Sequence, residues 1–228
     1  MSEETVGGST EPVEVLEDAR PSFELVPLDC PTCGAAVEAS GVDVVFYCTA
    51  CRNGYSFDIE NNALEPVDVA FVAASHIAAH DYRPFWLLSA EVEIRRRGGG
   101  RGGDISGILG ALLGSRSSDR RAMGAVDGTF AIPAFHSSLD STIELVHRYT
   151  RALPELGERL GERLLGGCYG VDDAEKLAHF AVIASEVDKP DVLKQLDYRI
   201  RFGAARLLGV PFQLEGEVWR DAIYGIGV

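Results

Sequence analysis

Basic residues are scarce and long hydrophobic runs are absent in this sequence of 228 residues. Its uninterrupted apolar stretches are far shorter than the roughly 18–20 residues that a membrane-spanning helix needs. Residues 1–29 contain neither the basic nor the apolar region of a secretory signal, so we expect a soluble, cytoplasmic protein without a transmembrane segment. Asp and Glu outnumber Lys and Arg by 35 to 21, and this net charge of −14 argues against a surface that binds nucleic acid all over.

The familiar motifs of enzyme sites are missing as well. The sequence has no G-x-S-x-G, no phosphate-binding P-loop and no G-x-G-x-x-G after a strand. Two weaker candidates are the lone thiol Cys168, in a Gly-rich segment, and the pair His76 and His80, which stand four residues apart. No neighbour of Cys168 is identifiable as its base, and the Glu of the catalytic His pair is absent. An enzyme that uses either candidate therefore ranks third among the functional hypotheses.

The chain has five cysteines, and four of them form two Cys-x-x-Cys pairs, Cys30-Pro-Thr-Cys33 and Cys48-Thr-Ala-Cys51. In each pair both sulfurs point the same way from one tight turn, so two pairs can supply the four corners of a tetrahedral Zn²⁺ site. Gly34 suits the positive φ that such a turn tends to need. Because four thiolates leave no position for water, we predict one structural zinc ion per chain, with these four cysteines as its ligands.

The run Cys-Pro-Thr-Cys-Gly, a predicted hairpin and Cys-Thr-Ala-Cys together resemble the zinc ribbon, a module of the rubredoxin-like knuckle group. The resemblance covers residues 28–60 and implies that the four cysteines bind zinc, although Arg52 stands where a glycine is often found. Between the pairs we expect strands at 35–39 and 42–47, and Asn53-Gly54 predicts a further turn. Zinc ribbons serve transcription factors, polymerase subunits, ribosomal proteins and enzymes, so the resemblance does not select a function.

The four cysteines have other possible uses. Two disulfides need an oxidising compartment, which the missing signal does not support. A redox Cys-x-x-Cys pair belongs at the start of a helix in a βαβ unit, whereas these two pairs flank a hairpin. Iron, bound as in rubredoxins, stays an alternative to zinc, because its ligands would be the same four cysteines.

Beyond residue 60 the patterns predict an α+β domain with a largely antiparallel sheet over 61–228. Period-two alternation predicts strands at 86–94, 129–135 and 196–204, with another at 207–212 and a turn at Asp127-Gly128. Helical spacing predicts a first helix that Ser137 or Ser138 caps and that ends near residue 152. A short helix is predicted at 155–165. A third helix is predicted to begin at a capping box formed by Asp172 and Glu175. The order of strands, helices and strands favours this fold class.

Two segments differ from the rest in charge. Residues 1–29 hold eight acidic residues and one arginine, and we expect a disordered acidic leader over 1–27. The Arg/Gly-rich composition of residues 97–121 indicates a flexible insertion between two strands of one sheet. Within this insertion, apolar residues recur at helical spacing. Its beginning, Arg-Arg-Arg-Gly-Gly-Gly-Arg, resembles the arginine-glycine boxes of RNA-binding proteins, although a solvated basic loop is the simpler interpretation.

Two classes of function agree with these patterns. The first is a non-enzymatic assembly or adaptor protein, in which the zinc ribbon and the α+β domain mediate protein–protein interaction within a complex. The alternative is a nucleic-acid-binding protein that uses the ribbon and the Arg/Gly insertion, with Tyr47, Tyr55 and Phe57 as a surface on which bases stack.

Overall fold

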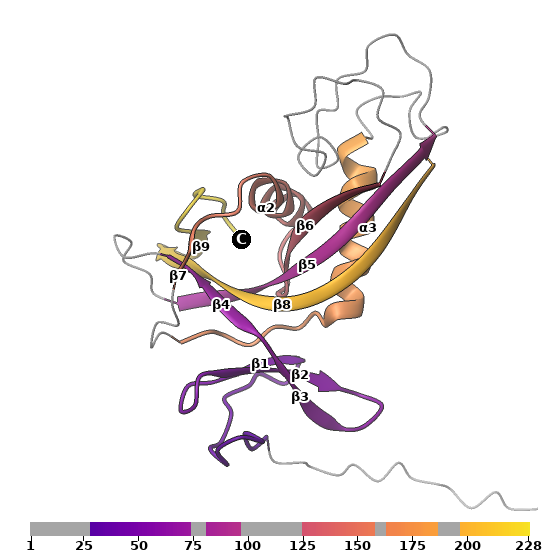
Figure 1. The fold of residues 1–228 in the computed structure, drawn as a ribbon. Helices are drawn as coiled ribbons and strands as arrows, with labels where there is room; N and C mark the ends of the chain where they lie inside the picture. Colours follow the sequence, from indigo (N-terminus) through magenta and orange to yellow (C-terminus); the bar gives the residue numbers. More distant parts are fainter. Residues whose placement is uncertain (1–27, 74–80, 97–124, 158–162, 187–196) are drawn as a thin grey trace, which may run out of the picture.

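The structure is a computed structural model, and it describes residues 28–73, 81–96, 125–157, 163–186 and 197–228 (Figure 1). The described chain folds into two β-sheets and two helices, in which most neighbouring strands are antiparallel. It is therefore a mixed α and β protein, as the sequence predicts. The predicted leader 1–27, the whole insertion 97–121 and the pair His76 and His80 lie outside the described residues.

The small sheet has three antiparallel strands in the order β1 (Val45–Cys48), β2 (Asn53–Asp58) and β3 (Ala63–Val67). The predicted pairing of 35–39 with 42–47 is wrong, because β1 pairs with β2 instead. Asn53-Gly54 is not a turn but the start of β2, and the turn lies at 49–52. Gly54 is needed there for close packing, since a Cβ at this position would collide with Val69.

The large sheet has the strand order β6-β5-β8-β4-β7, and β9 (Val218–Asp221) pairs with β8. Its other strands are β4 (Val69–Val72), β5 (Asp81–Arg96), β6 (Ala125–Pro133), β7 (Leu156–Gly157) and β8 (Asp197–Glu215). Only the pair of β4 and β8 is parallel among these described strands. The strands predicted at 196–204 and 207–212 form the single strand β8 of 19 residues.

Two local predictions for this domain are wrong. Asp127-Gly128 lies inside β6, where the two residues pair with Glu91 and Ala90, because the longer pairing with β5 overrides the local turn signal. Residues 155–165 do not form the predicted helix where the structure describes them. They contain β7, and Leu164 forms a bridge to Tyr82. The prediction that the insertion joins two strands of one sheet is confirmed, since β5 and β6 are antiparallel neighbours.

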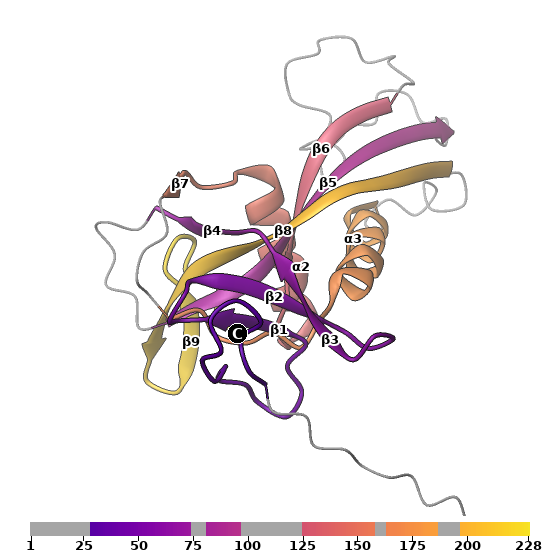
Figure 2. The ribbon, with the colours of Figure 1, turned by 60° about the horizontal axis from the view of Figure 1, so that its bottom comes forward.

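Three strands of the large sheet continue beyond the body of the molecule as a curved extension (Figures 1 and 2). We call this extension the arm, and it consists of residues 89–96 of β5, 125–129 of β6 and 197–206 of β8. In the arm β8 is the outer strand and β5 the middle one. Helix α3 (Val171–Glu186) lies beside the arm.

Helix α2 (Leu139–Arg151) begins as predicted, because the Ser138 hydroxyl accepts a hydrogen bond of 3.1 Å from the Ser141 N–H. Helix α3 begins at Val171, so Asp172 lies in the first turn and not at the cap, and the predicted capping box is wrong. Acidic residues in that turn still favour the helix through its dipole. Neither of these two described helices is long and apolar enough to cross a membrane.

The large sheet is buried on both of its faces along the body of the molecule. The side chains of Trp86 and Leu88 pack into a cluster with α3 and with Val45 and Tyr47 of the small sheet. Phe85 and Leu87 of β5 pack against α2 and the C-terminal residues. Because both faces are covered, residues 207–212 of β8 are buried without interruption, instead of alternating between buried and exposed.

The buried carboxylate of Asp221 links the C-terminal turn to α2 through hydrogen bonds. The side chain of Asp221 is 1% exposed, and it accepts hydrogen bonds from the Tyr149 hydroxyl at 2.7 Å and from the N–H groups of Ile223, Tyr224 and Ile226 at 3.1, 2.7 and 2.6 Å. Burial, and next the charge of Asp221, raise the pKa of Tyr149 far above its ordinary value, so this hydroxyl stays a donor.

Replacing this carboxylate should therefore destabilise the whole fold. Asp221→Ala leaves one hydroxyl and three N–H groups without their acceptor, and we expect it to lower the free energy of unfolding by about 2–4 kcal/mol in urea titrations. Asp58→Ala is the matched control, because Asp58 also accepts from backbone N–H groups, of Glu60 and Asn61, but at an exposed turn. An equal loss in the two variants would contradict this role for Asp221.

Candidate metal centre

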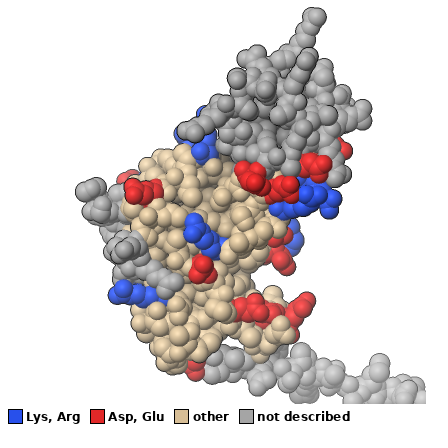
Figure 3. All heavy atoms as spheres, viewed as in Figure 1, with Lys and Arg blue, Asp and Glu red and all other residues tan. Residues whose placement is uncertain are grey.

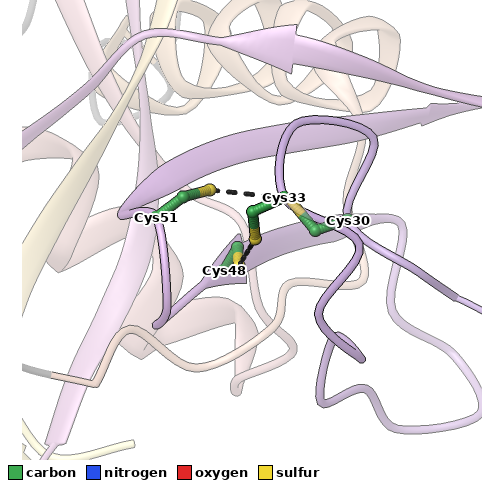
Figure 4. Close-up of side chains that lie close together, drawn as sticks. All are labelled: Cys30, Cys33, Cys48 and Cys51. Carbon is green, nitrogen blue, oxygen red and sulfur yellow. Dashed lines mark hydrogen bonds between the residues drawn. The ribbon is translucent and has the colours of Figure 1, made fainter.

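The four paired cysteines converge on one point between the two turns (Figure 4). The Sγ atoms of Cys30, Cys33, Cys48 and Cys51 all lie within 4.8 Å of one another. The closest distances are 3.5 Å between Cys30 and Cys51 and 3.6 Å between Cys33 and Cys48. Four sulfurs bound at 2.3 Å to one zinc ion lie about 3.8 Å apart. The structure thus brings together all four predicted ligands at a spacing that is compatible with a zinc site.

The arrangement of the sulfurs also bears on the alternatives. All four cysteines are free, and each close contact joins a sulfur of the first turn to a sulfur of the second. Neither Cys-x-x-Cys turn opens a helix, which is the position of a redox-active pair. The geometry therefore favours one shared centre over two separate pairs.

The two turns have the same backbone pattern. In the first, the N–H of Gly34 donates to the carbonyl of Cys30 at 2.8 Å, and in the second the N–H of Arg52 donates to the carbonyl of Cys48 at 2.7 Å. Gly34 has the positive φ of 71° that its sequence position predicts, and Arg52 adopts a φ of 62°. Arginine thus takes up a conformation that favours glycine, so the chain keeps the turn even where the expected glycine is missing.

A tyrosine of the small sheet contacts one of the sulfurs directly. The Tyr55 hydroxyl lies 3.1 Å from the Sγ of Cys30 and 2.7 Å from the Thr32 hydroxyl. The sequence did not indicate this contact with Cys30, and we expected Tyr55 on a surface where bases stack. That interpretation is wrong for Tyr55 and Tyr47, which are 1% and 5% exposed, whereas Phe57 is half-buried. The one feature of the sequence that could have indicated the contact between Tyr55 and Cys30 is Thr32, which lies between Cys30 and Cys33.

The electrostatics of the cluster favour a bound cation. Burial opposes ionisation of Cys30, but hydrogen bonds from Tyr55 and from backbone N–H groups outweigh it and lower the pKa of this thiol to about 6. For Cys33 a backbone N–H at Ala35 favours the thiolate, yet burial and the neighbouring sulfurs raise the pKa to about 12. The thiolate of Cys30 therefore forms easily, whereas a second thiolate at Cys33 needs a positive charge nearby.

The small sheet that carries the cluster is joined to the large domain. The N–H groups of Val44 and Val45 donate to the carbonyl of Gly167 at 2.7 and 2.9 Å, and the N–H of Gly167 donates back to Val45 at 3.0 Å. The ring of Tyr47 meets the ring of Phe71 edge-on at 5.7 Å. These contacts join the sheet that carries the four cysteines to the large domain, and they link residues too distant in sequence for a local pattern to indicate.

The other candidates for chemistry gain no support. Cys168 is half-buried, and burial, assisted by the charges of Asp43 and Asp173, raises the pKa of its thiol against a backbone hydrogen bond from His136. A raised pKa makes this thiol a poorer nucleophile. Among the described residues, the four paired cysteines are the only group of three or more side chains that could hold a metal ion.

The backbone of the first turn allows a direct test. A Cβ at Gly34 or at Gly41 would meet no heavy atom within 4 Å, but only Gly34 has a positive φ. We therefore expect Gly34→Ala to lower the free energy of unfolding by about 1 kcal/mol in denaturant titrations. Gly41→Ala, the matched control, should stay within about 0.5 kcal/mol of the parent or exceed it. Equal effects would show that the turn does not need the left-handed conformation.

Comparison with known proteins gives no relative from which the function of the four cysteines could be inferred. No protein-family model, no curated protein and no solved structure matches the chain. Its function is therefore inferred from the residues of this chain and from their positions in its fold.

Proposed function

We propose that this protein is a zinc-binding, non-enzymatic assembly protein. In this proposal the two cysteine turns and the strands β1 to β3 form a zinc ribbon, and the α+β domain mediates protein–protein interaction. The observation that carries the proposal is the cluster of four sulfurs within 4.8 Å. Four thiolates fill the tetrahedral coordination of Zn²⁺ completely, so the bound ion supplies structure and offers no position to a substrate.

The position of the cluster supports a structural role. Cys30 and Cys48 are each 2% exposed, and they belong to a small hydrophobic cluster with Phe46 and Tyr55. That cluster is too small to stabilise a fold by itself, and bound metal commonly replaces the missing core in such modules. The small sheet in turn covers Phe71 and Trp86 of the large sheet through Val45 and Tyr47. Closing the metal centre thus completes one wall of the main core.

The absence of a reactive group near the cluster supports the non-enzymatic part. As far as the described residues extend, the polar side chain that contacts its sulfurs is that of Tyr55, and the Tyr55 hydroxyl in turn contacts the Thr32 hydroxyl. Both are neutral hydroxyls that hydrogen-bond to sulfur or to each other, and neither has a base beside it. The nucleic-acid alternative loses two of its three stacking residues, because Tyr47 and Tyr55 are buried.

Metal content tests the first half of the proposal. The purified chain should contain one zinc ion, measured by native mass spectrometry and elemental analysis. Cys48→Ser should lose the metal and unfold the small sheet, because the centre and the sheet form together. Cys168→Ser is the matched control and should keep the metal. Iron in place of zinc would change the identity of the ion, and the absence of both metals from fresh, reduced protein would refute the site.

Partner recovery tests the second half. The tagged full chain, isolated gently from its native cell, should bring down a protein partner in a fixed molar ratio, measured by quantitative mass spectrometry against a tag-only control. A chain that elutes as a monomer and turns over a small substrate would end the assembly proposal. Recovery of nucleic acid in place of protein, lost as the salt concentration rises, would favour the alternative.

A further inference from the structure

The strand β8 has an open edge along the arm. On one side it pairs with β5 from Asp197 to Phe212, but on the other side it pairs only with β4 at Leu207–Gly209 and with β9 at Phe212–Glu215. The last bond before the opening runs from the Leu207 N–H to the Asp68 carbonyl at 2.8 Å. Among the described residues, the segment 197–206 therefore has a strand neighbour on one side only (Figure 2).

The two faces of this open segment differ in chemistry. One face packs Tyr198, Ile200, Phe202 and Ala205 against the core beneath α3. The other face exposes three arginines, Arg199, Arg201 and Arg206. A register shift between the pairs Leu88↔Ala205 and Ala90↔Phe202 adds one residue to β8 at 203–204. This bulge keeps Phe202 and Ala205 on the apolar face and leaves the arginines together on the other.

The arginines lie at the outer edge of the sheet, and the acidic side chains lie further in. Arg201 donates to Glu91 of β5 at 2.6 Å, and Arg199 stands opposite Glu93. Figure 3 shows acidic and basic side chains side by side near the end of the arm. A strand added to the edge would lie about 4.8 Å from β8 and about twice as far from β5. Its nearest charged neighbours would be Asp197 at the start of β8 and then the three arginines, which favour acidic side chains in cross-strand pairs along the rest of the edge.

A hollow lies at the inner end of the open edge. It has a volume of about 450 Å³ and is lined by Pro66, Val67, Asp68, Trp86, Val171 and Ala205, beside Asn53 and Gly54. Figure 3 shows the surface indented between the small sheet and the rest of the molecule. Val67, Val171 and Ala205 offer contacts to an apolar residue of an added strand, beside the polar groups of Asn53 and Asp68. Docking there would place the partner against both the small sheet and α3.

We propose that residues 197–206 of β8 form a docking edge for a partner segment that adds to the sheet as an extended strand, with acidic residues on one face and apolar residues on the other. The proposal rests on the assembly function and names the chemistry of its partner. Backbone hydrogen bonds along the edge supply the attachment, and the arginine and apolar faces supply the selectivity. A second copy of this chain fits poorly, because an antiparallel β8–β8 pair gathers six arginines on one face.

The test uses the full zinc-loaded chain and a synthetic peptide probe. The probe is a capped peptide of about eight residues in which Glu and Val alternate. Titration calorimetry should show binding of this probe, and hydrogen exchange should slow at amides within 198–206 when it is bound. Two control peptides should bind at least roughly tenfold more weakly: one with Lys in place of Glu, and one with N-methylated amides along one edge.

Charge reversal on the protein complements the peptide series. Arg199→Glu with Arg201→Glu should weaken binding of the Glu/Val probe roughly tenfold or more. The matched control combines Arg148→Glu and Arg163→Glu, two exposed arginines away from the arm. Melting curves verify folding, and Arg206→Glu serves as a milder variant if the double variant unfolds. Equal binding of the Glu and Lys probes, equal binding of the N-methylated probe, or a β8-dependent homodimer would each overturn the proposal.

The failure of this inference can be told apart from the failure of the assembly function. If the co-purified partner is recovered equally with the parent chain and with the Arg199→Glu and Arg201→Glu variant, the docking edge is refuted and the assembly function stands. If the parent chain recovers no partner and does not bind the probe, both are refuted. Loss of the native partner only in the edge variant, with the control variant unaffected, supports both.

Discussion

The convergence of four sulfurs is the constraint on which the rest of the structure depends. Sulfurs as close as 3.5 and 3.6 Å cannot all carry a negative charge unless a cation lies among them. The hydroxyl of Tyr55 stabilises the thiolate of Cys30, whereas the neighbouring sulfurs help to raise the pKa of Cys33. A metal ion held by the four sulfurs would resolve this conflict, and it would help a three-stranded sheet with little core of its own to hold its shape.

The small sheet is also part of the main body. Its strand β1 bonds to Gly167, and its Val45 and Tyr47 belong to the same hydrophobic cluster as Trp86 and Phe71. The large sheet is consequently sandwiched, with the small sheet and α3 on one face and α2 with the C-terminal turn on the other. The arm is the part of the sheet that this covering does not enclose on every side.

The sequence predicted what depends on short-range chemistry. The four cysteines, the positive φ of Gly34, the cap at Ser138 and the alternating segment 86–94 all follow from neighbouring residues, and the structure has the four cysteines together and the three local features as predicted. The failures share a different cause. Asn53-Gly54 and Asp127-Gly128 carry turn signals, but pairing with distant strands places both inside strands. Gly54 in fact serves a close contact with Val69.

The position of β8 within both the sheet and the chain has a consequence for biosynthesis. The four paired cysteines precede every strand of the large sheet in the chain, so a metal ion that they hold can bind on the ribosome before that sheet is made. The strand that joins β5 to β4 begins only at Asp197, so the large sheet cannot form until the ribosome has passed that residue. Val45 and Tyr47 of the small sheet therefore remain uncovered until then. A nascent chain of this design should depend on chaperones during elongation.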